Sequence, residues 1–343
     1  MGKQNFPFGG DPSSIRPAPA KSVLDRANDL FHFEQAIRGD ALPPLDIPAE
    51  MIPPPPEPAK PADPATFAAG QEIGAEGEES ASAAAAPAAA APRARDWTGP
   101  ARKLDHEAME EAGYLVPGAP VGRTSEEFRI IKRELLARIR GSRQQEVIPN
   151  GNIILIASAH PGDGKTYCAV NLALSLAAES GLEILLIDAD IAKPGIPSSL
   201  GLTPGKGMMD ALADPHLPVE DLVIRTDIPS LCVLPAGQST DRDAEYISSA
   251  RMDALIAALV AGRPERVLIF DSPPLLAASP AAALAGHVGQ TVLVVRADRT
   301  TEGALRDAAG LLKECPHVQL LLNGVQFSTS GRRFGSYYAR EAD

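Results

Sequence analysis

The stretch Asn152-Ile-Ile-Leu-Ile-Ala-Ser-Ala-His-Pro-Gly-Asp-Gly-Lys-Thr166 decides the fold of this chain. Its first half is aliphatic, which predicts a strand buried on both faces. Its second half, Ala159–Thr166, has the spacing of a phosphate-binding loop, except that Ala replaces the leading Gly. A helix is predicted from Lys165 to Ser180, so the loop lies between a strand and a helix, as this motif requires.

Further aliphatic runs alternate with segments rich in Ala, Leu and Arg. Strands that are apolar on both faces and separated by helices indicate a parallel sheet covered on both sides. The predicted fold is doubly wound α/β with a mainly parallel sheet, and its ligand site lies beyond the carboxyl ends of the strands. The predicted strands are 152–158, 183–188, 231–235, 266–271, 290–295 and 318–323, and the predicted helices are 124–139, 165–180, 248–261, 279–286 and 301–314. The first of these helices opens with Thr124 and Glu127 at the spacing of a capping box.

Composition divides the 343 residues into four parts. Residues 40–100 are rich in Pro and Ala and have little large apolar surface to offset the entropy of ordering, so they are expected to form a disordered linker. Residues 1–39 include an amphipathic pattern at 20–37, which predicts an isolated helix that either docks a partner or has no role. Residues 101–325 are the predicted P-loop domain, and residues 326–343 a flexible tail.

The charge and the cysteines exclude several classes of protein. A net charge of −12 argues against general nucleic-acid binding, which normally needs a basic face. Cys168, Cys232 and Cys315 lack metal-ligand spacing and are expected to be buried residues in a reducing compartment. No apolar run approaches the length that crosses a bilayer. The sequence therefore predicts a cytoplasmic protein whose membrane attachment comes through a partner.

The loop has the groups that a nucleotide triphosphate needs. Gly162 and Gly164 can turn successive N–H groups toward phosphate oxygens, and the helix that follows adds the positive end of its dipole. Lys165 is predicted to neutralise the β- and γ-phosphates of ATP, and the Thr166 hydroxyl to ligate Mg²⁺. A chance glycine turn is the alternative, which the strand-loop-helix context disfavours. The predicted nucleotide-binding residues are Pro161, Gly162, Asp163, Gly164, Lys165, Thr166 and Tyr167.

Carboxylates at strand ends complete the predicted site. Asp271 ends one strand and resembles the Walker B acid, which positions Mg²⁺ directly or through water. Asp188 ends another strand and Asp190 follows it, although a solvated turn is the alternative for this pair. A carboxylate near the γ-phosphate could accept a hydroxyl proton, which a kinase needs. The predicted catalytic residues are Lys165, Asp188, Asp190 and Asp271, and the predicted Mg²⁺ ligands are Thr166, Asp188 and Asp271.

Three motifs in this order resemble those of the bacterial tyrosine kinases (BY-kinases), over residues 125–338. Ala159–Thr166 corresponds to Walker A, Leu185–Asp190 to the additional Walker A′ motif, and Leu268–Leu276 to Walker B. Residues 126–133 are most similar to the autokinases associated with exosortase loci. The resemblance implies an ATP-dependent autokinase that regulates exopolysaccharide production by phosphorylating C-terminal tyrosines between subunits.

The resemblance also implies partners and further residues. Tyr337 and Tyr338 would be the autophosphorylation sites, and an ordinary frayed terminus with two aromatic residues is the alternative. A homo-oligomer is expected, together with a separate inner-membrane polysaccharide chain-length protein that recruits the chain. The chain departs from related division-site ATPases by having His160 where they carry a lysine. The residues that resemble the subunit-contact motif of the family are Glu126, Arg129 and Lys132.

Two other functions remain open on the sequence. One is an ATPase switch, in which nucleotide binding changes assembly without phosphorylating any protein. The other is a non-enzymatic adaptor, in which the linker and the N-terminal helix tether an assembly and the nucleotide is a structural ligand.

Overall fold

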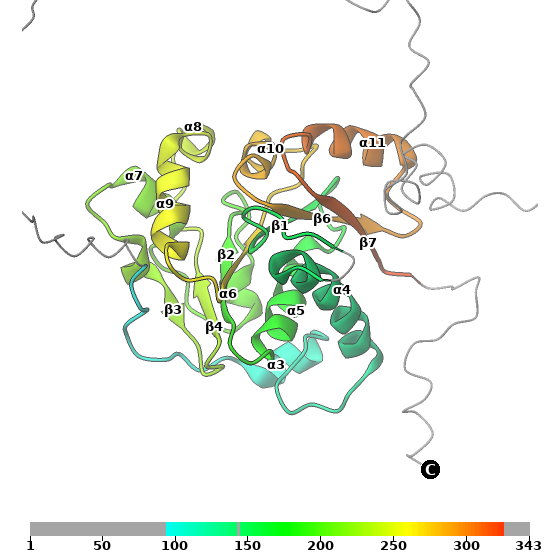
Figure 1. Cartoon of the computed structure of the whole chain (residues 1–343), viewed down its shortest axis with the longest axis horizontal. Helices are drawn as coiled ribbons and strands as arrows, with labels where there is room; N and C mark the ends of the chain where they lie inside the picture. Colours follow the sequence, from blue (N-terminus) through cyan, green and yellow to red (C-terminus); the bar gives the residue numbers. More distant parts are fainter. Residues whose placement is uncertain (1–93, 143–144, 326–343) are drawn as a thin grey trace, which may run out of the picture. The chain divides into compact units, whose positions relative to one another are not determined.

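The computed structural model describes residues 94–142 and 145–325. The predicted helix at 20–37, the predicted linker up to residue 93 and the tail with Tyr337 and Tyr338 lie outside the described residues. Within the described part, Figure 1 shows a central sheet with helices packed on both of its faces.

Seven strands form one sheet, in the order β3-β4-β2-β5-β1-β6-β7. Neighbouring strands pair in parallel, except β3 with β4, which is antiparallel. This arrangement confirms the predicted doubly wound, mainly parallel fold. The strands are β1 (Ile153–Ser158), β2 (Glu183–Asp188), β3 (Ile224–Arg225), β4 (Leu231–Leu234), β5 (Arg266–Asp271), β6 (Gln290–Arg296) and β7 (Val318–Asn323).

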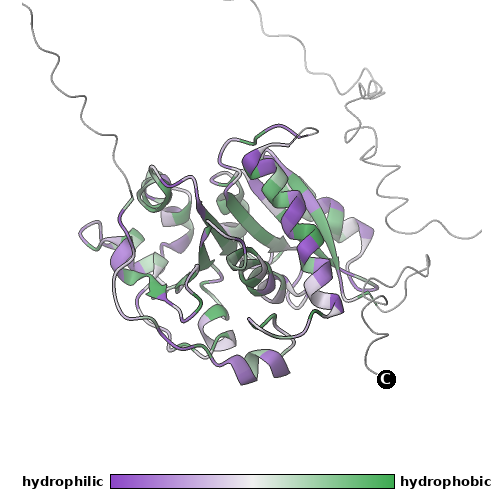
Figure 2. Cartoon of the chain, turned by 60° about the horizontal axis from the view of Figure 1, so that its bottom comes forward, coloured by the Kyte–Doolittle hydropathy of each residue, from purple (hydrophilic) through white to green (hydrophobic). Residues whose placement is uncertain are grey.

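Alternate side chains of the central strands enter two different cores, as strand geometry requires. Leu155 packs in the core beneath α7, α9, α10 and α11, whereas Ile154 and Ile156 pack in the core beneath α3, α4 and α5. Figure 2 shows the strands as a hydrophobic centre and the helices as polar on part of their surface. The helices are α3 (His106–Glu111), α4 (Arg123–Arg140), α5 (Lys165–Ala177), α6 (Ile196–Ser199), α7 (Met208–Ala213), η2 (Val219–Leu222), α8 (Asp243–Ile247), α9 (Ala250–Val260), α10 (Ser279–Ala285) and α11 (Glu302–Leu311).

The start of α4 differs from the sequence prediction. A capping box opening at Thr124 was expected, but the N-cap is Gly122, so Thr124 already lies inside the first turn. Glu127 instead pairs with Arg123, at 2.7 Å. The predicted capping box is therefore wrong: the N-cap lies two residues earlier than Thr124, and the exposed Arg123–Glu127 pair at i,i+4 adds to the first turn.

Two other helix boundaries also differ. The predicted helix from Lys165 ends at Ala177 rather than at Ser180, and Gly181 turns the chain toward β2 with a φ of 77°. The helix predicted at 248–261 is α9, which begins at Ala250 because Ser249 acts as its N-cap and accepts a hydrogen bond from Arg251 N.

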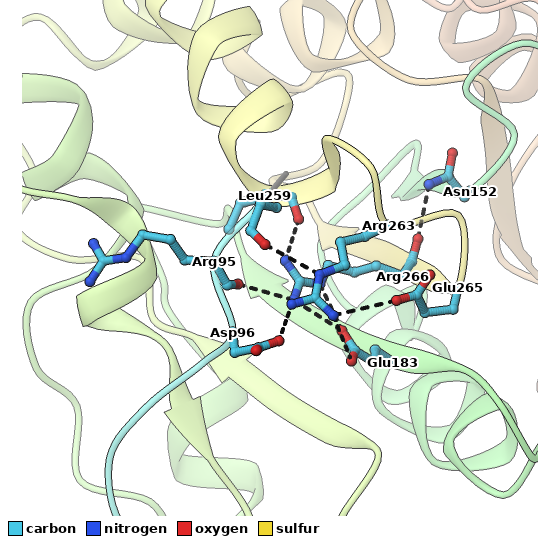
Figure 3. Close-up of polar contacts among 9 residues, drawn as sticks. Arg95, Asp96, Asn152, Glu183, Leu259, Arg263, Glu265 and Arg266 are labelled. Atoms are coloured by element: carbon cyan, nitrogen blue, oxygen red, sulfur yellow. Dashed lines mark hydrogen bonds and ion pairs between the residues drawn. The ribbon is translucent and has the colours of Figure 1, made fainter. Parts of the chain in front are cut away.

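Residues 94–100, which the sequence analysis places in the linker, contact the base of the domain. Ala94 N donates to Ala261 O, and Arg263 pairs with Asp96. The guanidinium of Arg266 lies 3.8 Å from the centre of the Trp97 ring. Figure 3 shows the two arginines, from the loop before β5 and the start of β5, reaching this segment.

The three cysteines agree with the sequence prediction. Cys168, Cys232 and Cys315 are buried and form no disulfide. Among the helices of residues 94–142 and 145–325, none combines the length and apolar character needed to cross a membrane.

Candidate nucleotide site

The loop between β1 and α5 has a backbone that only glycine adopts readily at two positions. Gly162 has a φ of 80° and Gly164 a φ of 98°, and Gly164 is the N-cap residue of α5. The carboxylate of buried Asp163 accepts a hydrogen bond from His160 N, at 2.9 Å. The loop is therefore held in shape from within, with its amides next to the positive end of the α5 dipole.

Asn323, the last residue of β7, fixes the same loop from outside. Its Nδ2 donates to Asp163 O at 2.9 Å. A Cβ atom on Gly164 would clash with this Nδ2, and the positive φ of Gly164 disfavours a side chain in any case. Asn323 was not among the predicted site residues. Its position at the carboxyl end of a parallel strand was the signal that could have identified it.

Lys165, the first residue of α5, is buried and paired. Its Nζ lies 2.9 Å from Asp190 Oδ2, and both side chains are no more than 10% exposed. The other oxygen of Asp190 accepts a hydrogen bond from Lys193 N, at 3.2 Å. The structure therefore brings together the predicted phosphate-binding lysine and one of the two predicted catalytic acids of the turn after β2.

Asp188 is engaged with backbone amides. Its Oδ2 accepts hydrogen bonds from Gly195 N at 2.9 Å and Ile196 N at 3.0 Å, and its Oδ1 accepts one from Asp190 N at 3.3 Å. Burial raises the pKa of Asp188 to about 6, while these amides act in the opposite direction. The contacts hold the turn that positions Asp190.

Asp271 is the unusual carboxylate of the site. It is in register with Asp188 on the neighbouring strand and is fully buried. Neither of its oxygens accepts a hydrogen bond of normal geometry from the described residues. Burial raises its pKa to about 7, and Lys165 and the Thr166 hydroxyl partly oppose this shift. A buried carboxylate without a partner is costly, which is typical of a group whose partner arrives with a ligand.

The donor set fits Mg²⁺ that is bound together with a nucleotide. In residues 94–142 and 145–325, no group of three or more His, Cys, Asp or Glu side chains is arranged to hold a metal ion by itself. Mg²⁺ in phosphate-transfer sites needs one or two protein ligands, because phosphate oxygens and water complete its shell. The unpaired oxygens of Asp271 and the nearby hydroxyl of Thr166 are ligands of this type.

Tyr167 faces away from the loop. Its hydroxyl donates to Gly113 O at 2.9 Å, and its ring packs against Tyr114 and Phe128. These contacts join α5 to the segment after α3 and to α4. Pro161 and Gly162, in contrast, are exposed at the mouth of the loop.

The three residues predicted for subunit contact lie in different surroundings. Glu126 and Arg129 pair with each other across one turn of α4, at 2.6 Å, and Arg129 is 47% exposed. Lys132 is buried, where its Nζ donates to Ser175 O at 3.1 Å and pairs with Glu179 at 2.6 Å. The structure thus gives Lys132 a contact within the chain, between α4 and α5.

The sheet, the loop and the acids beside Lys165 define a P-loop nucleotide-binding protein. The family model described as "ParA: NUBPL iron-transfer P-loop NTPase" matches residues 150–274. The chain is also 32% identical over 190 residues to the tyrosine-protein kinase YwqD of Bacillus subtilis, a match that covers 55% of this chain and 78% of YwqD. The chain therefore belongs to the bacterial tyrosine kinase family, as its three motifs predicted.

A longer relative also matches part of the chain. The chain is 30% identical over 213 residues to EpsB of Ralstonia nicotianae, which is also named as a tyrosine-protein kinase; the match covers 60% of this chain and 27% of EpsB. The chain thus spans about a quarter of the length of that relative. A solved structure, that of the chimerical protein CapA2B2, has a TM-score of 0.52 at 24% identity and covers 65% of this chain and 92% of its own. This likeness supports the fold.

Proposed function

We propose that the chain is an ATP-dependent protein-tyrosine autokinase that phosphorylates Tyr337 and Tyr338 of a second copy. The proposal rests on the arrangement of four residues at one edge of the sheet: Lys165 forms an ion pair with Asp190, and Asp188 is in register with Asp271. A nucleotide-binding protein that only senses ATP needs the phosphate loop, whereas a kinase also needs a carboxylate to receive the proton of its acceptor.

The proposed binding step exchanges one partner of Lys165 for another. The loop amides and the α5 dipole attract the triphosphate, and Lys165 leaves Asp190 to bind its β- and γ-oxygens. Thr166 and Asp271 would hold Mg²⁺, with Asp188 close to the same ion; bound Mg²⁺ neutralises charge on the phosphates. Once separated from Lys165, the carboxylate of Asp190 is available at the position where the γ-phosphate is transferred.

The proposed transfer step is a direct displacement. The tyrosine oxygen forms a bond to the γ-phosphorus, and the bond between that phosphorus and the β–γ bridging oxygen breaks, so that ADP leaves. Asp188 or Asp190 receives the phenolic proton. The residues of this chain orient the reactants and stabilise charge, which is most of what this reaction requires of a protein.

Incubation with labelled ATP tests the proposal. We expect the parent chain to acquire phosphotyrosine, Tyr337→Phe/Tyr338→Phe to lose most of the label, and Lys165→Met to lose it all by abolishing ATP binding. Equal labelling of the double tyrosine variant and the parent would contradict the tail as main acceptor. Hydrolysis of ATP without any phosphotyrosine would instead support the ATPase switch, which the Lys165–Asp190 pair also suits because ATP must break it.

We also propose that the chain works as a homo-oligomer with a separate inner-membrane polysaccharide chain-length protein in exopolysaccharide production. The support is the resemblance of the motifs and, for the oligomer, the exposed Glu126–Arg129 pair on α4. We expect Arg129→Ala to lower the oligomer mass measured by light scattering. Lys132→Ala is the matched variant, because it should instead lower stability by loosening α4 from α5. An unchanged mass after Arg129→Ala would contradict this contact.

A further inference from the structure

The P-loop has two chemically different sides, because β1 lies between β5 and β6 in the sheet. On the β5 side, Asp188 and Asp271 end their strands in register. On the side of β6 and β7, the groups next to the loop are the amide of Asn323 and the turn that follows β6. The transferred phosphate and its metal ion need the acidic side, so a cation on the side of β6 and β7 is placed for the phosphates that remain in ADP.

Arg299 reaches the P-loop from this second side. A Cβ atom on Gly162 would lie 3.9 Å from Arg299 Nη1, so the guanidinium stands directly beside the loop. Arg299 is exposed, and within the part of the chain that the structure describes its side chain has no ion-pair or hydrogen-bond partner. A cation that is free beside a phosphate-binding loop is placed to donate to a phosphate oxygen.

The turn that carries Arg299 is tightly held. Asp298 has a φ of 61°, a conformation that Asp tolerates better than most residues. Arg296 O accepts hydrogen bonds from Arg299 N at 3.2 Å and Thr300 N at 3.0 Å, and Arg296 N donates to Thr300 Oγ1 at 3.0 Å. Thr301 then caps α11. Since the backbone is already ordered, binding an anion restricts only the side chain of Arg299.

We propose that Arg299 binds the phosphates that remain in ADP. This inference rests on the proposed nucleotide site. Arg299 would contact the same phosphates before and during phosphoryl transfer. The contact should therefore strengthen nucleotide binding and leave the transfer rate at saturating ATP unchanged.

Calorimetric titration of the full chain with ATP and with ADP tests the assignment. We expect Arg299→Gln to weaken both nucleotides by the same factor, about threefold to tenfold, because one charge-assisted contact is lost at an exposed position. The loss should shrink at high salt. Arg306→Gln is the matched control: Arg306 is exposed on α11 and paired with Glu302 at 2.8 Å, so its removal should leave both affinities unchanged.

Two results would overturn the proposal. One is an Arg299→Gln variant that binds ATP and ADP as the parent does, and the other is a loss confined to ATP, which would place Arg299 at the transferred phosphate instead. The test is separate from that of kinase activity. A parent chain that binds both nucleotides but never forms phosphotyrosine would contradict the proposed function and still allow the Arg299 comparison, whereas a parent that binds neither nucleotide would overturn both.

Discussion

Strands β2 and β5 carry charged residues at both of their ends, and the two ends are built differently. At the amino ends, Glu183 is in register with Arg266, so opposite charges meet. At the carboxyl ends, Asp188 is in register with Asp271, so like charges meet. Arg266, Asp188 and Asp271 are buried, whereas Glu183 is partly exposed. The same two neighbouring strands therefore hold an ion pair at one edge of the sheet and an acid pair at the other.

The amino end is almost completely satisfied. Arg266 is fully buried, yet its Nη1 donates to Leu259 O at 2.5 Å and its Nε to Glu183 Oε2 at 3.0 Å (Figure 3). Burial lowers the pKa of the Arg266 guanidinium and Glu183 raises it. The unpaired polar group there is the indole N–H of Trp97, which is neutral. This end ties residues 94–97 to the domain.

The carboxyl end is less well satisfied within the described residues. Asp271 has no hydrogen bond of normal geometry from the described residues, and Asp188 and Asp190 raise its pKa further. The comparison teaches that burial alone does not distinguish a structural charge from a functional one. What distinguishes them is whether the folded chain supplies the partner or leaves that to a ligand.

The largest effect on stability is expected at the amino end. Arg266→Leu removes the donor to the Leu259 carbonyl and leaves Glu183, which is 36% exposed, with its longer contact to Arg263 at 3.7 Å, so it should lower the free energy of unfolding by about 3 kcal/mol. Chemical denaturation followed by Trp97 fluorescence measures this, since Trp97 is the one tryptophan of the sequence. Arg306→Leu is the control, with an expected change below about 0.5 kcal/mol. Similar midpoints for the two variants would show that the Arg266 contacts add no stability.

At the carboxyl end, a substitution of Asp271 is expected to raise the free energy of unfolding at high pH, by less than the loss expected for Arg266→Leu. The pKa of Asp271 is about 7 in the folded chain, against an ordinary value of about 3.9 when unfolded. The folded state therefore binds this proton more tightly, so this group makes the free energy of unfolding fall as pH rises from about 4 to about 7. Asp271→Asn removes that loss. Its stability relative to the parent should be about 2 kcal/mol greater at pH 8 than at pH 5.

Nucleotide-free chains, melted at the two pH values, provide the measurement. Asp241→Asn is the control, because Asp241 is exposed and its replacement changes the net charge equally. If the difference in unfolding free energy between Asp271→Asn and the parent does not depend on pH, the buried carboxylate is ionised in the folded chain without cost. That result would contradict the contrast between the two ends of the strands. The same variant should lose the part of ATP affinity that depends on Mg²⁺, which would link the lost stability to the ligand.

Local sequence was sufficient for the parts of the site that follow from one strand and its next loop. Asp188 and Asp271 each end an apolar strand, and Lys165 follows a loop of fixed spacing after another strand. Their place at the carboxyl edge therefore follows from the parallel fold. Asn323 was missed because its partner, Asp163 O, is 160 residues away in the chain. Arg299 was missed because an isolated exposed arginine in a turn has no pattern of its own.

The sequence by itself determined the doubly wound fold, the P-loop and the family, because periodicity and motif spacing are local properties of the chain. Tertiary structure alone decided which charges meet. It paired Lys165 with Asp190, buried Lys132 against α5, and set Arg266 over Trp97. It also gave Asp271 no hydrogen bond of normal geometry from the described residues. The physical reason is that the energy of a buried charge depends on neighbours brought together by strand order and helix packing, which no spacing along the chain encodes.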